Sequence, residues 1–511
     1  MQPYLCINIS THMKGGVVTA YKIKRSVLVT IFFFMMAGVA IAQKNVIWYD
    51  PIEVCDKTYG NLHPRIILDQ AHKPLVLWGD INGKAYLSKF NGKTFSEPVQ
   101  ISSGTQPVFT ESWAGPEIAG HGDTIYIVYK KMPEETGHIF IKHSYDGGKT
   151  FSIETQVDDD RPYITRFPTV ALDPYGNPLV AFMKLDQGFT NARYAVEKST
   201  DLGEDFTFDT SITDFSGGKV SDCCPATLIE SGNATVILYR DNFEQHRNIW
   251  AGISHNGAIS FPHGIQADLA DWATDKCPAN APHGIIIGDT LYSVFASGDN
   301  PLVYLSKTTL SNLTVMSDPV TGHFTGLVSQ NFPRIANYGN AAALVWEQAN
   351  GRANQVCLLF ASDITTGFPI RYDTVATGNV TTTDVVMGGS HIYIVWQDDY
   401  TGKLMCRIGF YEETEVNKLL AENTTIALKP APNGKFFTVA LPHISSCMML
   451  DMDGKEYEMD IKASASSCRV ITEDLEPGMY IVKIYGQDDK AYTYKYQVKE
   501  VAEKKGRRRD R

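Results

Sequence analysis

The stretch Ser144-Tyr-Asp-Gly-Gly-Lys-Thr-Phe151 has the composition of a tight hairpin turn that is closed by an aromatic residue. The side chains of Ser144 and Asp146 can hydrogen-bond to nearby backbone amides, and this favours a tight turn. The glycines supply the positive φ angle that such a turn requires. We therefore expect a turn between two antiparallel strands, with Phe151 folding back into the core of its own sheet.

Degenerate copies of this stretch recur along the chain at a nearly constant spacing. Ser88-Lys-Phe-Asn-Gly-Lys-Thr-Phe95 lacks only the Asp, and Ser199-Thr-Asp-Leu-Gly-Glu-Asp-Phe206 keeps Ser, Asp, Gly and Phe. Weaker copies begin at Ser254, Ser306 and Ser362, so that successive starts lie 56, 55, 55, 52 and 56 residues apart. A period of this length with strand-like content indicates a repeat array, and four-stranded propeller blades fit it.

A second marker runs in step with the first, because a proline opens an apolar run in each repeat. These prolines are Pro64, Pro116, Pro168, Pro225, Pro282 and Pro333, and Asp384 is assigned to the equivalent place in the last repeat. Short β-branched and aromatic runs between Gly, Asn and Asp turns are typical of meandering antiparallel strands. We predict an all-β fold whose main part is a seven-bladed β-propeller, with six blades and an irregular seventh unit as the alternative.

The last repeat lacks an outer strand of its own, since its third strand, Leu404 to Phe410, is followed by polar residues. The segment Asn45 to Val54 resembles the outer strands of the other repeats. We expect this segment to complete the last blade, which would close the ring without leaving an exposed edge. In that arrangement Cys55 and Cys406 could form a disulfide.

The pattern S-x-D-x-G-x-T-F at Ser144–Phe151, together with its copies, resembles the Asp-box of the BNR/sialidase-like β-propellers. The resemblance implies a propeller that recognises or acts on carbohydrate, as a sialidase-like exo-glycosidase on anionic sugars. Known sialidases use an arginine triad, an Asp acid/base and a Tyr–Glu nucleophile pair. Because the Asp-boxes of this family lie on the far side of the blades from the active site, the resemblance implies that Asp146 is scaffold.

Segments outside the repeats predict export. Residues 1–42 read as a signal peptide, with a basic stretch at Lys22–Arg25, an apolar core and Ala40-Ile-Ala42 before the expected cleavage point. We therefore expect a secreted or cell-surface protein with a propeller at residues 43–420.

Residues 421–500 break the period and predict a small β-sandwich. Their phrases, such as Leu475-Glu-Pro-Gly-Met-Tyr480, resemble the C-terminal sorting domain of type IX secretion cargo, and this implies the export machinery as a partner; an ordinary accessory β-domain is the alternative. Residues 501–511 form a basic tail.

Composition limits the other partners. The formal net charge is −11, and nucleic acid is excluded as a partner because backbone binding needs clustered Lys and Arg. We expect a carbohydrate or glycoprotein ligand, a monomeric chain, no cofactor and no metal. Cys277 lies in a loop equivalent to the one that holds Cys223 and Cys224, so a disulfide from Cys277 to either residue is favoured over a metal site. Cys447 and Cys468 could link two strands of the C-terminal domain.

Candidate site residues come from two sets of loops that converge on one rim of the ring. One set precedes the inner strands and the other follows the second strands. A guanidinium group can donate two parallel hydrogen bonds to a carboxylate, and a carboxylic acid can protonate a glycosidic oxygen. We expect catalytic roles for Asp222, Asp241 and Glu347, and substrate-binding roles for Arg65, Arg166, Arg240, Arg247, Arg334 and Trp272.

The match to the sialidase motif is incomplete. The family's first arginine lies in an R-I-P phrase, whereas this chain has Pro64-Arg65-Ile66, and Arg166-Phe-Pro168 falls in the third repeat. No Tyr–Glu pair can be assigned. A non-catalytic propeller that binds glycan or protein, and a lyase acting on uronate-containing polysaccharide, therefore remain as alternative functions. Any one of these Arg or Asp residues can instead serve a loop ion pair or a turn.

Overall fold

The computed structural model describes residues 46–411 except 56–59, 160–161, 213–214, 216–218, 232–233, 321–327, 350 and 352, and residues 428–498 except 432–434, 440–443, 452–454, 464–467 and 487–490. Within these ranges the regular structure is β-strand, apart from one 3-10 turn at Ile364–Thr366. The predicted all-β class is confirmed. The expected signal peptide and basic tail lie outside the described residues. No helix in the described ranges is long and apolar enough to cross a membrane.

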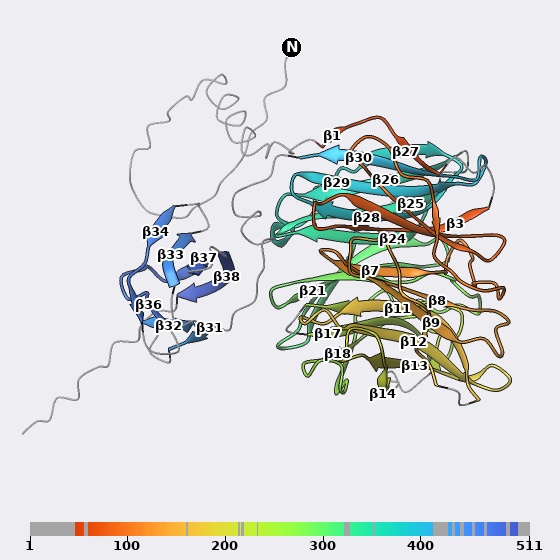
Figure 1. The fold of residues 1–511 in the computed structure, drawn as a ribbon, viewed down its shortest axis with the longest axis horizontal. Coiled ribbons are helices and arrows are strands. Elements are labelled where there is room, and N and C mark those ends of the chain that lie inside the picture. Colours follow the sequence, from red (N-terminus) through yellow and green to blue (C-terminus); the bar gives the residue numbers. More distant parts are fainter. Residues whose placement is uncertain are drawn as a thin grey trace, which may run out of the picture. The chain divides into compact units, whose positions relative to one another are not determined.

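Seven antiparallel sheets in residues 46–411 follow one another along the chain as blades of a propeller (Figure 1). Blades one to three consist of β3 (Asn61–Leu68), β4 (Pro74–Asp80), β5 (Ala85–Lys89) and β6 (Val99–Gln100); β7 (Glu117–His121), β8 (Thr124–Lys130), β9 (Ile139–Ser144) and β10 (Thr155–Gln156); and β11 (Ile164–Leu172), β12 (Pro178–Asp186), β13 (Thr190–Lys198) and β14 (Thr207–Ile212). Blades four to six consist of β15 (Lys219–Val220), β16 (Thr227–Glu230), β17 (Thr235–Asn242), β18 (Ile249–Ser254) and β19 (His263–Gln266); β20 (His283–Ile287), β21 (Thr290–Ser297), β22 (Leu302–Thr309) and β23 (Thr314–Pro319); and β24 (Ser329–Tyr338), β25 (Ala341–Ala349), β26 (Asn354–Ala361) and β27 (Asp373–Gly378).

Blade seven is built from both ends of the propeller sequence. It combines β28 (Val380–Gly388), β29 (His391–Asp398) and β30 (Lys403–Phe410) with β1 (Ile47–Trp48) and β2 (Ile52–Cys55). Both N-terminal strands pair antiparallel with β30, so the predicted closure by the N-terminal segment is confirmed. The predicted Cys55–Cys406 disulfide is absent, because Ile52 rather than Cys55 lies opposite Cys406, and Cys406 keeps a buried thiol.

The first strands of the blades surround a common axis. They contact one another in a closed cycle that runs β3, β7, β11, β16, β20, β24, β28 and back to β3. The second strands contain runs of buried apolar residues, such as residues 75–78 of β4, 125–129 of β8 and 341–346 of β25, because both faces of these strands pack against neighbouring blades. In β4, Leu75 and Leu77 pack toward blade two, whereas Val76 and Trp78 pack toward blade seven.

The turn that follows β9 has the hydrogen bonds that its sequence predicts. Asp146 Oδ1 accepts hydrogen bonds from the backbone N–H groups of Lys149 and Thr150 at 2.9 and 3.0 Å, and Ser144 Oγ accepts one from Gly148 at 2.9 Å. Phe151 packs against the core between blades one and two. The copy at Ser199 repeats this geometry, since Gly203 N donates to Ser199 Oγ at 2.8 Å.

The C-terminal part contains two four-stranded sheets that share one core, which agrees with the predicted sandwich. One sheet has the order β31 (Leu428–Pro430), β32 (Phe436–Val439), β36 (Cys468–Ile471) and β35 (Ile461–Ala463), and the other has the order β34 (Glu456–Glu458), β33 (Ile444–Asp451), β37 (Gly478–Gly486) and β38 (Ala491–Val498). Phe437 of the first sheet and Val482 of the second belong to the same buried cluster. The predicted Cys447–Cys468 disulfide is absent: the two residues lie in different sheets, and Cys447 is a free thiol.

Candidate functional site

A β-bulge near the start of four inner strands determines which side chains reach the axis. The residue at the bulge has a positive φ in each case: His63 at 57°, Phe167 at 50°, Phe332 at 49° and Thr382 at 48°. The pairing register shifts at the same points in β3, β11, β24 and β28. Proline follows the bulge in three of these strands, where its missing N–H costs no ladder hydrogen bond.

The register also corrects the assignment of Asp384. Asp384 pairs with Val395 in the way that Arg334 pairs with Val345, so Thr383, and not Asp384, occupies the proline position. Asp384 is therefore equivalent to the residue that follows each proline. In five of the blades this position carries a polar side chain that joins one cluster, here called the axial cluster: Arg65, Glu117, His283, Arg334 and Asp384.

Glu117 is the centre of the axial cluster. Its Oε1 lies 2.8 Å from Arg65 Nε and 3.0 Å from His63 Nε2, and its Oε2 lies 3.9 Å from a terminal nitrogen of Arg334. Burial opposes the charged carboxylate, but Arg65, His63 and Arg334 outweigh it and hold the pKa of Glu117 well below its usual range. Glu117 belongs to blade two and Arg334 to blade six, so this contact crosses the axis.

His63 is neutral in this cluster. Burial, followed by the nearby Arg65 charge, lowers the pKa of His63 from 6.5 to about 4. Its Nε2 lies 3.0 Å from Glu117 Oε1, and its Nδ1 lies 3.3 Å from the carbonyl oxygen of Ser112 and 3.4 Å from a guanidinium nitrogen of Arg65. Each ring nitrogen therefore faces an oxygen that can accept the single N–H of the neutral ring.

The Nε of Arg334 is held by a hydrogen bond, whereas its two terminal nitrogens make none within the described residues. Its Nε donates to Asp384 Oδ1 at 2.9 Å, while Asp384 Oδ2 accepts the backbone N–H of Ile66 in blade one at 3.0 Å. The two terminal nitrogens of Arg334 make no hydrogen bond within the described residues, and 13% of the side chain is exposed. One of these nitrogens lies 3.9 Å from Glu117 Oε2, an ion-pair distance that leaves its N–H groups without a hydrogen bond. A guanidinium held in this way can donate both terminal N–H groups to a carboxylate in bidentate fashion.

Glu347 lies on the same face of blade six as Arg334. On β25, Val345 packs toward blade seven and Trp346 toward blade five, so Glu347 also faces blade seven. Its Oε2 accepts from Thr381 Oγ1 at 2.6 Å, and its Oε1 accepts from Asn354 Nδ2 at 3.0 Å. Burial raises the pKa of Glu347, with a smaller contribution in the same direction from Asp399. This carboxyl group therefore keeps its proton to a higher pH than an ordinary glutamate.

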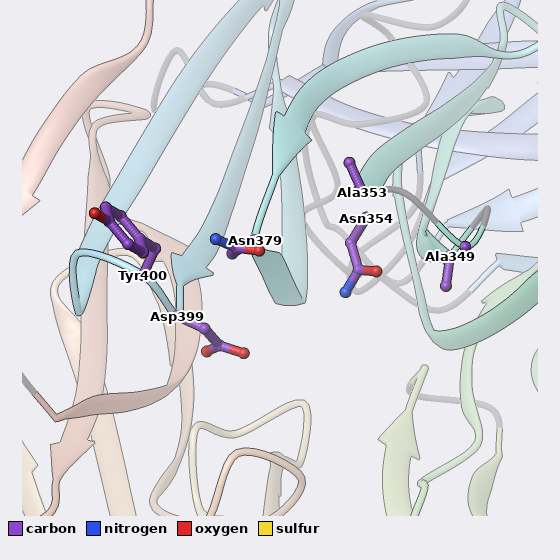
Figure 2. Close-up of a pocket in the computed structure, with 7 residues that line it drawn as sticks. Ala349, Ala353, Asn354, Asn379, Asp399 and Tyr400 are labelled. Atoms are coloured by element: carbon purple, nitrogen blue, oxygen red, sulfur yellow. The ribbon is translucent and has the colours of Figure 1, made fainter.

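A hollow of about 480 Å³ lies beside Glu347, between the hairpins of blades six and seven. Figure 2 shows Tyr400 on one side of the hollow, Asn354 on the other, and Asn379 and Asp399 between them. Asn354 is the same residue that donates to Glu347. The hollow thus lies at the same blade boundary as the Arg334–Asp384 pair of the axial cluster.

The other predicted site residues lie in blades three to five, where most of them have structural partners. Arg166 pairs with Glu134 and donates to the Asp222 carbonyl oxygen at 2.9 Å, and the Asp222 side chain is exposed. Asp241 is buried and accepts the backbone N–H of Asn248, which closes the β17–β18 hairpin. Arg247 donates to Ser221 Oγ at 2.7 Å, and the half-buried Trp272 donates to Asp299 at 3.0 Å.

Arg240 is fully buried and cannot reach a ligand. Its terminal nitrogens donate to the carbonyl oxygens of Arg247 and Ala296, at 2.5 and 2.8 Å, and to Asn280 Oδ1 at 3.0 Å. We therefore reassign Arg240 from substrate binding to tying blade four to blade five. The disulfide Cys223–Cys277 joins the same two blades, and it is one of the two pairings that the sequence predicted.

The structure brings together only part of the predicted set. Of the predicted arginines, Arg65 and Arg334 meet at the axis, and Glu347 lies beside Arg334. Among the described residues, no tyrosine hydrogen-bonds to Glu117 or Glu347. His63, His283, Asn354, Asp399 and Tyr400 were not predicted as site residues. The two histidines flank prolines of the repeat marker, Pro64 and Pro282, and this position in the repeat is the signal that could have identified them.

No protein-family model matches the sequence, and no curated protein matches it. Three solved structures illustrate the structural likeness. A protein of unknown function from Dyadobacter fermentans is 10% identical with a TM-score of 0.44, over 72% of this chain and 99% of that one. The α-L-arabinofuranosidase Arb93A from Fusarium graminearum is 12% identical with a TM-score of 0.43, over 62% and 98%. A PL25 ulvan lyase is 9% identical with a TM-score of 0.47, over 71% and 96%. Likeness at this level carries no argument about ligand or reaction.

Proposed function

We propose that the propeller recognises an acidic carbohydrate at its axis and that Arg334 binds the carboxylate of the sugar. The observation that carries this proposal is the guanidinium group of Arg334. Its Nε donates to Asp384, one terminal nitrogen lies 3.9 Å from Glu117 Oε2, and neither terminal nitrogen makes a hydrogen bond within the described residues. Glu117 and Asp384 neutralise Arg65 and Arg334, and His63 and His283 are uncharged. The cluster therefore holds Arg334 in place without a surplus of positive charge that would bind anions indiscriminately.

Binding of uronic acids to an Arg334→Lys variant tests this proposal. Lysine keeps the charge but loses the planar fork, so we expect affinity for a uronic acid to fall about 10- to 100-fold, the size of a charged hydrogen bond. Arg193→Lys is the matched control, because Arg193 is an ion-paired rim arginine in blade three. Calorimetry on both variants decides the question. Equal affinity in the parent and in Arg334→Lys, or no uronate binding by the parent, would refute the proposal.

A catalytic role is the second candidate, and Glu347 is the observation that favours it. A carboxyl group whose pKa is raised by burial can act as a proton donor to a glycosidic oxygen. Glu347 and Arg334 lie on one face, offset by two residues across adjacent strands, a spacing that usually places Cα atoms about 7–8 Å apart. Release of a fluorophore from a panel of uronide and neutral glycosides is the assay. We expect Glu347→Gln to abolish turnover and to keep binding; unchanged turnover would remove Glu347 from the mechanism.

The sialidase-like specificity remains less well supported than acid recognition in general. Sialidases need a third arginine beside the first two, whereas Arg166 is engaged by Glu134 and the Asp222 carbonyl. We also propose, from sequence signals alone, that the chain is exported and that its C-terminal sandwich serves sorting. Cell fractionation of the full chain beside a chain truncated after residue 420 tests this second proposal.

A further inference from the structure

We propose that the hollow between the hairpins of blades six and seven is a second sugar subsite that takes a neutral residue next to the acidic one. This inference rests on the proposed function and adds the substrate class, namely an oligosaccharide in which an acidic residue is linked to a neutral residue. The acidic residue occupies the axis at Arg334, and the neutral residue occupies the hollow.

The size of the hollow suits a sugar ring. Its volume of about 480 Å³ lies within the range of ligand pockets, about 300–1,000 Å³. Tyr400 lies at the edge of the hollow and is 78% exposed, so most of its aromatic ring is in contact with solvent. The turn that carries Tyr400 is fixed, because Asp398 Oδ1 accepts the backbone N–H groups of Tyr400 and Thr401, each at 3.0 Å. An exposed aromatic ring on a fixed turn can stack on the apolar face of a pyranose or furanose.

The chemistry of the lining selects a neutral ligand. Asn354, Asn379 and Asp399 supply amide and carboxyl groups that can donate to and accept from sugar hydroxyls. Asp399 lines the hollow, and Asn354 in its wall donates a hydrogen bond to the carboxyl group of Glu347. Two carboxyl groups at one boundary disfavour a second anionic residue in the hollow, whereas hydroxyl groups meet no such penalty.

Hydrogen bonds link the wall of the hollow to Glu347, which shares a face of blade six with Arg334. Asn354, in the wall of the hollow, donates to one oxygen of Glu347, and Thr381 of blade seven donates to the other. Glu347 in turn shares its face of blade six with Arg334. Along β25, Glu347 therefore lies between Val345, the partner of Arg334, and Ala349, which lines the hollow.

The test compares Tyr400→Ala with Tyr175→Ala, a matched control at another exposed turn, where Tyr175 is 85% exposed. The probes are glucuronic acid and an array of uronate-containing disaccharides whose second residue is either neutral or acidic. We expect the parent to bind some acid–neutral disaccharide up to about tenfold more tightly than glucuronic acid. Tyr400→Ala should lose that advantage and leave glucuronic acid binding unchanged, while Tyr175→Ala should behave as the parent.

Each other outcome has a distinct meaning. If disaccharides bind no more tightly than glucuronic acid, or if acid–acid disaccharides bind as well as acid–neutral ones, the neutral subsite is refuted and axial recognition stands. If Tyr400→Ala weakens the binding of glucuronic acid and of the disaccharide equally, the hollow is not a separate subsite and the inference is likewise refuted. If the parent binds none of the probes, the proposed function fails and the subsite fails with it.

Discussion

Acid should destabilise the propeller through His63, and the size of the effect follows from its burial. The pKa of His63 is lowered from 6.5 to about 4 because the ring is buried beside Arg65. Between these two pH values His63 is protonated in the unfolded chain but not in the folded chain, so the free energy of unfolding decreases as the pH falls from about 6.5 to about 4. Applied to these two pKa values, the linkage relation gives a loss of about 2.5 kcal/mol between pH 7 and pH 4.5 from this one residue.

His63→Asn isolates this contribution, because asparagine tolerates the positive φ of 57° at this position and does not titrate. Urea unfolding followed by tryptophan fluorescence, at pH 7 and at pH 4.5, gives the free energy of unfolding of the parent and the variant. The variant loses a hydrogen bond to Glu117 at both pH values, so only the change with pH is informative. We expect the parent to lose about 2.5 kcal/mol more than His63→Asn on acidification. His121→Asn, at an exposed position, is the control. A pH dependence that is the same in the parent and in His63→Asn would show that His63 is not a buried neutral histidine.

Three further perturbations test other parts of the structure. Cys277→Ser opens a disulfide whose cysteines are 54 residues apart, and loop-closure entropy predicts a loss of about 4 kcal/mol in the free energy of unfolding; a loss below about 1 kcal/mol would contradict the entropic account. Arg240→Met should lower the free energy of unfolding by about 3–5 kcal/mol, because buried oxygen atoms lose their hydrogen-bond donor, and it should leave uronate affinity unchanged. Weaker uronate binding at unchanged stability would show that Arg240 is a ligand-binding residue after all. Glu347→Gln should stabilise the protein at pH 7 relative to the parent, because a raised pKa of Glu347 in the folded state contributes stability at low pH that is lost as the pH rises. Urea titrations at pH 4 and pH 7 should show the higher free energy of unfolding of the variant at pH 7 alone. An equal effect at both pH values would argue against a raised pKa.

Local chemistry explains why so much of the fold could be predicted from the sequence. The turn at Ser144–Thr150 uses only its own side chains and backbone, so its pattern carries its structure, and the spacing of its copies predicts the blades. The unmatched strand at the N-terminus was predictable because β30 would otherwise have an open edge. The prolines marked the inner strands. The bulges at those prolines were not predicted, and they shifted the assignment of Asp384 by one residue.

The division between site and scaffold required the tertiary structure. Arg334 and Arg240 look alike in the sequence, since each was assigned to a loop at the same rim, yet the terminal nitrogens of Arg334 make no hydrogen bond within the described residues, whereas Arg240 is fully buried. Glu117 and Arg334 are far apart in the chain and belong to blades two and six, so their contact exists only because the ring closes. The hollow at Tyr400 is likewise formed by hairpins of two different blades. The sequence by itself determined the repeat, the turns and the strands, because these depend on neighbouring residues; closure of the ring decided which side chains face one another across the axis and which are buried between blades.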